Sequence, residues 1–193
     1  PPPTPSLVLR PGHEGMPGAP LVDGRFGFAL AAGNFNGDSF DDLAIGMPGG
    51  AGAAAGYGGQ IYVLYGSSQG LQVASAHRMQ QGQDGVWGLY EGGDGFGFAL
   101  ATADFDLDGR DELAVGVPFE HWNTVSEVGV VHVLRGSAGG LTGANDVLFH
   151  RNVSGFPGAR TAGDRFGYSL AAARLTAYLP SPQLAVGAPG VNS

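Results

Sequence analysis

The sequence repeats itself at a fixed interval, and this periodicity constrains the fold more than any other feature. The dipeptide Phe26-Gly27 recurs as Phe96-Gly97 and, after a second step of equal length, as Phe166-Gly167. The same step carries residues 46–48 (Gly-Met-Pro) onto residues 116–118 (Gly-Val-Pro). A fixed period indicates one supersecondary unit copied several times, each copy burying its face against its neighbour. A motif found in one copy is therefore compared with the other copies before any chemistry is assigned to it.

The composition excludes several classes of protein. Hydrophobic residues make up 43% of the chain and charged residues 13%, which argues against disorder, and 36 Gly and 13 Pro favour many tight turns over long helices. No run reaches the ~18 apolar residues of a membrane span. A net charge of −8 makes a nucleic acid an unsuitable partner. There is no cysteine, so disulfides and thiol chemistry are excluded.

Each unit contains short apolar runs bounded by turn residues, four in the first and second units and three in the incomplete third. We expect a single domain over residues 1–193 with units at about 6–75, 76–146 and 147–193, the last incomplete. The expected strands are 6–10, 26–33, 43–47 and 60–65 in the first unit, 76–80, 96–103, 113–117 and 130–135 in the second, and 147–151, 166–173 and 184–188 in the third.

The residue pattern within these runs predicts an all-β fold. Ile61 and Val63 alternate with Tyr62, the period of two that is typical of strands. Four antiparallel strands per unit, repeated, indicate the blades of a β-propeller. The chain holds about two to three blades, and a propeller closes with at least four, so we expect a partial ring. The remaining blades of a longer protein, or further copies in a homo-oligomer, would complete it.

The second unit carries an acidic turn between its second and third runs. Asp104, Asp106 and Asp108 alternate along the turn, Gly109 follows, and Glu112 begins the next run. Such spacing wraps oxygen donors around one centre and suits Ca²⁺, which takes six to eight oxygen ligands. An EF-hand is excluded because its bidentate Glu would fall at Val115. Aspartates that only cap the turn are the alternative.

The first unit repeats the turn with less charge. Asn34 and Asn36 replace two aspartates, whereas Asp38 and Asp42 remain, so the ligand charge falls from about −4 to about −2. We therefore predict two Ca²⁺ sites of which the second is the stronger. The corresponding residues of the third unit, 173–183, have no carboxylate, and we expect no metal there.

Taken together, these motifs resemble the FG-GAP repeat, which builds the seven-bladed propeller of integrin α subunits. Phe-Gly is followed by the acidic turn and then by Leu-Ala-Ile-Gly-Met-Pro at 43–48 or Leu-Ala-Val-Gly-Val-Pro at 113–118, and residues 187–189 read Gly-Ala-Pro. The resemblance covers nearly the whole chain from residue 6 onward.

The resemblance implies two sets of calcium ligands. The first consists of the side chains of Asn34, Asn36, Asp38 and Asp42 with the Phe40 carbonyl, and the second of the side chains of Asp104, Asp106, Asp108 and Glu112 with the Arg110 carbonyl. The family usually has Asp where Glu112 stands. In this family the calcium loops are structural and lie on the face opposite the usual ligand-binding loops.

Aromatic residues gather in the connections expected on that opposite face. In an up-and-down blade the connections alternate between the two ends of the sheet, which separates these loops from the acidic turns. Aromatic residues on loops held by a rigid scaffold are typical of recognition sites. The candidate ligand-binding residues are Trp87, Tyr90, Phe119, His121 and Trp122. Packing of these rings onto the propeller rim is the alternative.

The expected function is a calcium-stabilised, non-catalytic binding or adhesion module of an extracellular, integrin-like propeller with a protein or glycan ligand. A Gly-Ser-Ser-Gln-Gly stretch at 66–70 matches a hydrolase nucleophile motif, but its counterpart in the next unit carries Ala138 in place of the nucleophile, so we do not expect an enzyme. A lectin-like carbohydrate-binding propeller and an accessory or targeting domain of a larger secreted enzyme are the alternatives.

Overall fold

A computed structural model describes residues 7–50, 56–153 and 158–190. The first sheet is antiparallel with the order β1-β2-β3-β4, and its strands are β1 (Leu30–Gly33), β2 (Asp42–Met47), β3 (Gln60–Leu64) and β4 (His77–Met79). The second has the order β5-β6-β7-β8, with β5 (Ala99–Ala103), β6 (Glu112–Val117), β7 (Val130–Arg135) and β8 (Thr142–Phe149). β9 (Ser169–Ala173) and β10 (Gln183–Gly187) form an antiparallel pair.

The all-β prediction is confirmed. A 3-10 turn at Val73–Ser75 is the one helical element in the described part of the chain, and no helix there could cross a membrane. The two four-stranded sheets are propeller blades, and β9 with β10 begins a third. Over the described residues the blades do not close into a ring, so this region is a partial propeller.

The sheet boundaries correct one expectation. Residues 76–80 were expected to open the second unit, but β4 pairs with β3 and therefore closes the first blade. In the same way β8, which starts at Thr142 rather than at 147, closes the second blade. Of the run expected at 6–10, residues 7–10 form no strand, and residue 6 lies outside the described residues.

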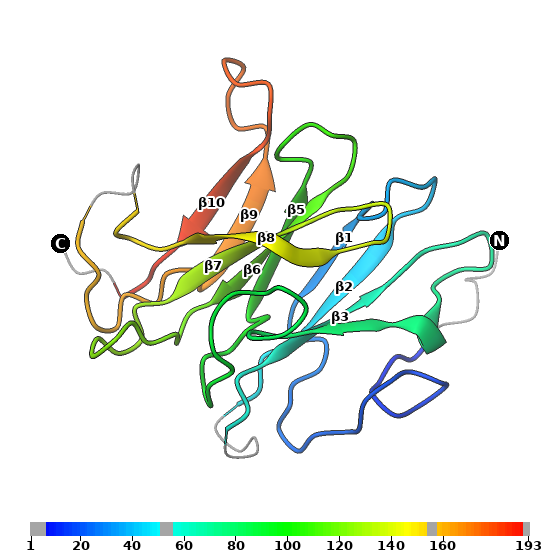
Figure 1. The fold of residues 1–193 in the computed structure, drawn as a ribbon, viewed down its shortest axis with the longest axis horizontal. Coiled ribbons are helices and arrows are strands. Elements are labelled where there is room, and N and C mark those ends of the chain that lie inside the picture. The colour runs from blue at the N-terminus through cyan, green and yellow to red at the C-terminus, as the bar shows by residue number, and fades with distance from the viewer. Residues whose placement is uncertain (1–6, 51–55, 154–157, 191–193) are drawn as a thin grey trace.

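The Phe-Gly dipeptides lie in a turn before the innermost strand of each sheet rather than within it, because β1, β5 and β9 begin three or four residues later. These three inner strands lie side by side, with β5 packed between β1 and β9 (Figure 1). Neighbouring blades thus cover both faces of the second sheet. For this reason β7 is buried along Val130–Leu134 instead of alternating between buried and exposed residues.

Pairs of glycines set the distance between blades. A Cβ atom on Gly46, in β2, would lie 2.1 Å from the carbonyl oxygen of Gly97 in the next unit, and a Cβ on Gly116 would lie 2.1 Å from that of Gly167. No real side chain tolerates such a distance. Glycine is therefore required at 46 and 116, the first residue of two Gly-x-Pro motifs, because the Phe-Gly backbone of the following unit lies directly against it.

Backbone hydrogen bonds join the blades at the same place. The Phe96 amide donates to the carbonyl of Gly58 over 2.8 Å, and the Phe166 amide donates to that of Val128 over 3.0 Å. Both phenylalanine rings are buried. Phe96-Gly97 and Phe166-Gly167 consequently each contribute a core side chain, an inter-blade hydrogen bond and a backbone surface that a glycine must face.

Replacing Gly116 with alanine should destabilise the protein by about 1–3 kcal/mol, because the new methyl group must push two blades apart. Urea unfolding followed by tryptophan fluorescence measures this change. Gly139→Ala is the matched control, since a Cβ at Gly139 would meet only the Ser137 hydroxyl at 3.7 Å. Equal stability of the two variants would show that the blades do not depend on the glycine contact.

Candidate metal centre and binding face

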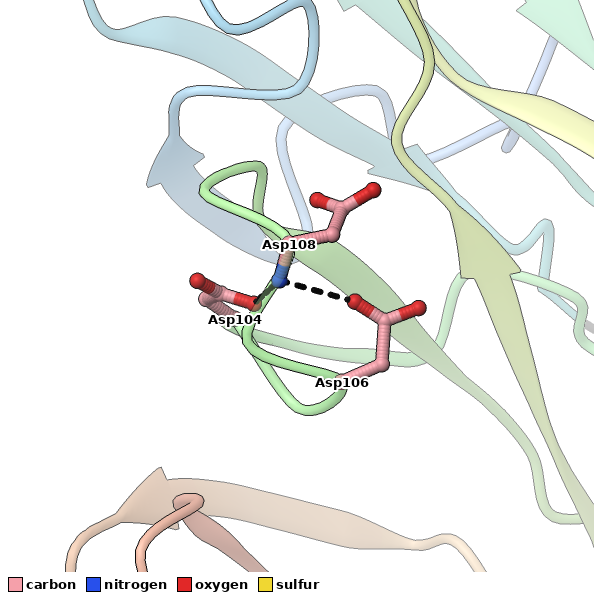
Figure 2. Close-up of side chains that lie close together, drawn as sticks. All are labelled: Asp104, Asp106 and Asp108. Carbon is pink, nitrogen blue, oxygen red and sulfur yellow. Dashed lines mark hydrogen bonds between the residues drawn. The ribbon is translucent and has the colours of Figure 1, made fainter.

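The second acidic turn joins β5 to β6 and brings three carboxylates together. Asp104, Asp106 and Asp108 each offer an oxygen, and these oxygens lie within 4.8 Å of one another. The Asp108 amide donates to Asp104 Oδ1 over 3.1 Å and to Asp106 Oδ1 over 3.2 Å, so the backbone curls around the carboxylates (Figure 2). Positive φ angles at Leu107 (63°) and Gly109 (88°) permit this tight path.

Two arginines partly offset the charge of this turn. Arg110 Nη1 lies 3.0 Å from Asp108 Oδ2, and Arg135 Nη1 lies 3.0 Å from Asp106 Oδ2. Both pairs are half-exposed, where ion pairs contribute little to stability. Three carboxylates paired with only two arginines leave the turn acidic and rich in oxygen donors. This donor set fits a hard cation such as Ca²⁺.

Glu112 lies beneath the turn. Its Oε2 accepts hydrogen bonds from the amides of Phe105 (2.9 Å) and Asp106 (3.4 Å), and burial raises the pKa of its carboxyl. Its Oε1 is buried and makes no hydrogen bond of normal geometry among the described residues, although the Gly136 amide is near enough to lower the pKa of the carboxyl. Glu112 is not one of the three clustered carboxylates. An orphaned oxygen at the base of the same turn is nevertheless consistent with a fourth ligand, and its role as one stays a prediction.

The residue at the start of the second strand fastens each turn through its backbone. Asp42 Oδ2 accepts from the Phe35 amide over 2.9 Å, as Glu112 does from that of Phe105, and Gln183 Oε1 accepts from the Leu175 amide over 2.8 Å. The third turn keeps this hydrogen bond although it has no carboxylate. The position is therefore first a structural one, independent of any metal.

In the first turn, asparagine side-chain amides donate hydrogen bonds to oxygens that a cation would otherwise contact. Asn36 Nδ2 donates to Asp38 Oδ2 over 2.9 Å, and Asn34 Nδ2 donates to the Asp38 carbonyl over 2.7 Å. The Phe40 amide donates to Asp38 Oδ1 over 2.7 Å. Asp42 is engaged by backbone amides, and Asp38 is the carboxylate of this turn that lies between the two asparagines. This arrangement agrees with a weaker site here, which remains a prediction.

The face at the other end of the blades carries the candidate aromatic residues. Trp87, in the β4–β5 connection, stacks on Trp122 of the β6–β7 connection, with ring centroids 5.8 Å apart and planes 18° apart. Arg160 lies over the Trp122 ring at 4.3 Å, and His150 packs on it at 4.6 Å. Trp122 is thus fixed by its neighbours, whereas Trp87 is 54% exposed.

The other candidates divide between two places. His121 borders a hollow of about 720 Å³ together with Trp87 and Trp122. Tyr90 instead packs edge-on against Tyr57 at 6.1 Å, and Phe119 packs edge-on against Phe98 at 5.4 Å. The five residues predicted from the sequence therefore do not form one site.

Sequence reasoning missed an aromatic row whose members occupy the same position in each repeat. The Phe98 ring lies 4.8 Å from that of Phe28 and 4.7 Å from that of Tyr168. With Phe119, these rings line a hollow of about 630 Å³. The repeat itself was the signal that could have identified them.

Two buried carboxyls were missed as well. Asp94 is 2% exposed and Glu120 is 6% exposed. Burial, and then the charges of Glu120 and Glu91, raise the pKa of Asp94 to about 7. Burial also raises the pKa of Glu120, against the opposing effects of Gln81 and His132. The second blade therefore carries an acidic pair on the face opposite the acidic turns.

Comparison with known protein families matches the FG-GAP repeat at residues 26–64 and 96–134, and both acidic turns lie within these segments. The chain contains FG-GAP repeats. Relatives with FG-GAP regions include the integrin alpha-V of Gallus gallus, 32% identical over 174 residues (87% of this chain and 15% of the relative), and the integrin alpha-3 of Mus musculus, 31% identical over 150 residues (77% and 12%).

The FG-GAP region of a phospholipase is also similar. The phosphatidylinositol-glycan-specific phospholipase D of Rattus norvegicus is 40% identical over 96 residues, which cover 50% of this chain and 11% of the relative. The chain thus spans 11–15% of the length of these three relatives.

The buried carboxyls Asp94 and Glu120 predict that the free energy of unfolding depends on pH. Because the pKa of Asp94 is raised from 3.8 to about 7, the folded state keeps a proton that the unfolded chain releases, so stability falls as the pH rises through this window. Asp94→Asn should remove this part of the dependence, on the order of 3 kcal/mol between pH 4 and pH 8. Urea unfolding at constant calcium measures it.

Glu14→Gln, on an exposed residue, is the control for this comparison. The same dependence on pH in Asp94→Asn and in the unaltered protein would contradict the assignment.

Proposed function

We propose that this region is a calcium-stabilised, non-catalytic binding module of an extracellular FG-GAP propeller. Its acidic turns hold Ca²⁺ at one end of the blades, and its aromatic connections contact a protein or glycan ligand at the other. The observation that carries the proposal is the cluster of Asp104, Asp106 and Asp108, whose oxygens lie within 4.8 Å of one another and suit a hard cation such as Ca²⁺.

The calcium would act on folding. When bound, Ca²⁺ supplies positive charge that neutralises the converging carboxylates, and this chain's part is to hold those oxygens in place. Affinities of ~10⁻⁴–10⁻³ M, as in other extracellular modules, would suffice at the calcium concentration outside cells. Because the turn leads directly into β6, order in the turn also fixes where β6 begins.

Calcium should therefore raise the melting temperature, with a stabilisation of about 2.7 kcal/mol when free calcium is a hundredfold above the dissociation constant. Titration calorimetry should find tighter binding in the second turn than in the first. Asp106→Asn should abolish the tighter phase, and Asp38→Asn should remove only the weaker one. Unchanged calcium binding in Asp106→Asn would contradict the proposed site.

The binding face supports the other half of the proposal. Trp87 is exposed yet held by stacking on Trp122, an arrangement that offers a large contact surface at low conformational cost. This preorganisation favours recognition over simple packing of the rim.

Replacing Trp87 with alanine should lower the free energy of unfolding by only about 1 kcal/mol, because the ring is 54% exposed and its main contact is the stack on Trp122. The same change should weaken binding of a ligand to this face by about tenfold or more. Tyr178→Ala is the control, since Tyr178 is 96% exposed and lies at the opposite end of the blades. Full affinity in Trp87→Ala for an identified ligand would contradict the assignment.

An accessory domain of a larger secreted enzyme is the second candidate, favoured by the 40% identity to the phospholipase D. The sequence of the complete polypeptide tests it. A catalytic domain in the same polypeptide would support this candidate. A polypeptide with the domains of a membrane-anchored adhesion receptor would contradict it.

A further inference from the structure

A buried polar pair inside the second blade reaches the backbone of Trp87. His132, in β7, is fully buried, and the side chain of Asp146, in β8, is 2% exposed. His132 Nδ1 lies 2.6 Å from Asp146 Oδ2, and the same oxygen accepts a hydrogen bond from the Trp87 amide over 3.1 Å. Asp146 therefore joins a buried histidine to an exposed tryptophan of the binding face.

The first blade has different residues at all three positions. One repeat earlier, the counterparts of His132, Asp146 and Trp87 are respectively Tyr62, Ala76 and Pro17. The side chain of alanine has no hydrogen-bond acceptor, and proline has no backbone N–H to donate. The acceptor, its histidine partner and the amide that it holds thus occur together in the second blade and are replaced together in the first.

Tyr62 indicates that the core of a blade does not need the histidine. Phe26 packs edge-on against Tyr62 with ring centroids 5.5 Å apart, and Phe96 packs edge-on against His132 at the same distance. The two rings therefore fill equivalent places in their blades. The Tyr62 hydroxyl accepts a hydrogen bond from Gln60 Nε2, in its own strand, over 2.8 Å, whereas His132 directs its polar bond toward β8.

The His132–Asp146 pair is costly for stability. Both side chains lie in the interior, and His132 Nε2 and Asp146 Oδ1 have no hydrogen-bond partner in the described part of the chain. A buried pair that leaves polar atoms unpaired is often no better for stability than well-packed residues of similar size. Because Tyr62 and Ala76 occupy the equivalent positions without a buried carboxylate, stability alone does not account for the pair.

The backbone around Asp146 is shaped to bring the Trp87 amide within reach. The Gly143 amide donates to the Asp84 carbonyl over 3.2 Å, which holds this part of the β4–β5 connection against β8. A Cβ atom on Gly143 would collide with the Val86 nitrogen, so glycine is required for this approach. The counterpart of Gly143 in the first blade is residue 73, a valine, and the same close approach is not possible there.

We propose that His132 and Asp146 are positioning residues for Trp87. Asp146 fixes the Trp87 backbone, His132 fixes the Asp146 carboxylate, and the Trp87 ring is thereby kept stacked on Trp122. Neither His132 nor Asp146 lines the hollow beside Trp87, so both act through the tryptophan rather than on a ligand. A side chain that is ordered before binding lowers the entropic cost of binding. The inference rests on the proposed function, because it names what preorganises the proposed binding face.

The stacked indoles themselves report on this positioning, because Trp87 and Trp122 are the two tryptophans of the sequence. Indoles with centroids 5.8 Å apart couple their ultraviolet transitions, so circular dichroism of the unaltered protein should show a couplet that Trp87→Phe removes. The double variant His132→Tyr with Asp146→Ala carries the residues of the first blade. It should keep the signal of the β-sheets and lose most of the couplet.

Asp84→Asn is the matched control for the couplet. Asp84 lies in the same connection as Trp87 and pairs with His77 at 3.7 Å near the surface. Its side chain makes no contact with Asp146 in the described structure, so this variant should keep the full couplet. A couplet of full size in the double variant overturns the inference.

Hydrogen exchange of the Trp87 amide is a second test, and it starts from the unaltered protein. This amide should be protected, and Asp146→Ala should accelerate its exchange about fivefold or more, as expected for one lost hydrogen bond. The Gly82 amide, which donates to the Val86 carbonyl within the same connection, should keep its rate. A Trp87 amide that exchanges in the unaltered protein as fast as in an unstructured peptide also overturns the inference.

These outcomes are separable from those of the proposed function, because neither measurement uses a ligand. Loss of the couplet in the double variant would support the positioning role even if Trp87→Ala bound an identified ligand with full affinity. A full couplet in the double variant, together with a ligand that depends on Trp87, would support the binding face and contradict the positioning role.

Discussion

The close approach of glycine to glycine between neighbouring blades is the contact on which this architecture depends. Gly46 faces the Gly97 carbonyl, and Gly116 faces that of Gly167, at distances that leave no room for a Cβ. The Phe-Gly backbone can then donate a hydrogen bond to the preceding blade and insert its phenylalanine ring into the core between them. The two halves of the repeat signature, Phe-Gly and Gly-x-Pro, are thus complementary surfaces of a single interface.

The antiparallel order of the strands explains how one blade can carry both an acidic turn and an aromatic face. Connections alternate between the two ends of an antiparallel sheet, so the acidic turn after β5 and the aromatic connections before β5 and after β6 lie at opposite ends. The side chains of Asp42, Glu112 and Gln183 each accept a hydrogen bond from a backbone amide of their turn, so all three turns are fastened at the same place whether or not other carboxylates are present. The scaffold is therefore constant, and the charges placed on it vary from blade to blade.

Much of the fold could be predicted from the sequence because the fixed period aligns the strands of one unit with those of the next. The pattern locates strands but does not say which sheet a terminal strand joins, and for that reason residues 76–80 were assigned to the wrong blade. The cluster of Asp104, Asp106 and Asp108 followed from local spacing. The burial of Asp94 and Glu120 did not, because it arises only where two connections pack together.

Glu112 is a second residue whose burial could not be predicted from its spacing in the sequence. Its spacing indicated a fourth ligand, whereas the structure shows first a buried acceptor for backbone amides, a role that depends on the depth of the strand beneath the turn.

Hydrogen exchange of the Phe96 and Phe166 amides tests the inter-blade contact most directly, because each amide donates across the interface rather than within its own sheet. If the Phe-Gly and Gly-x-Pro backbones are locked together, both amides should exchange as slowly as those in the centre of β6, through global unfolding alone. Exchange as fast as that of exposed turns would mean that the blades separate readily and would contradict this account.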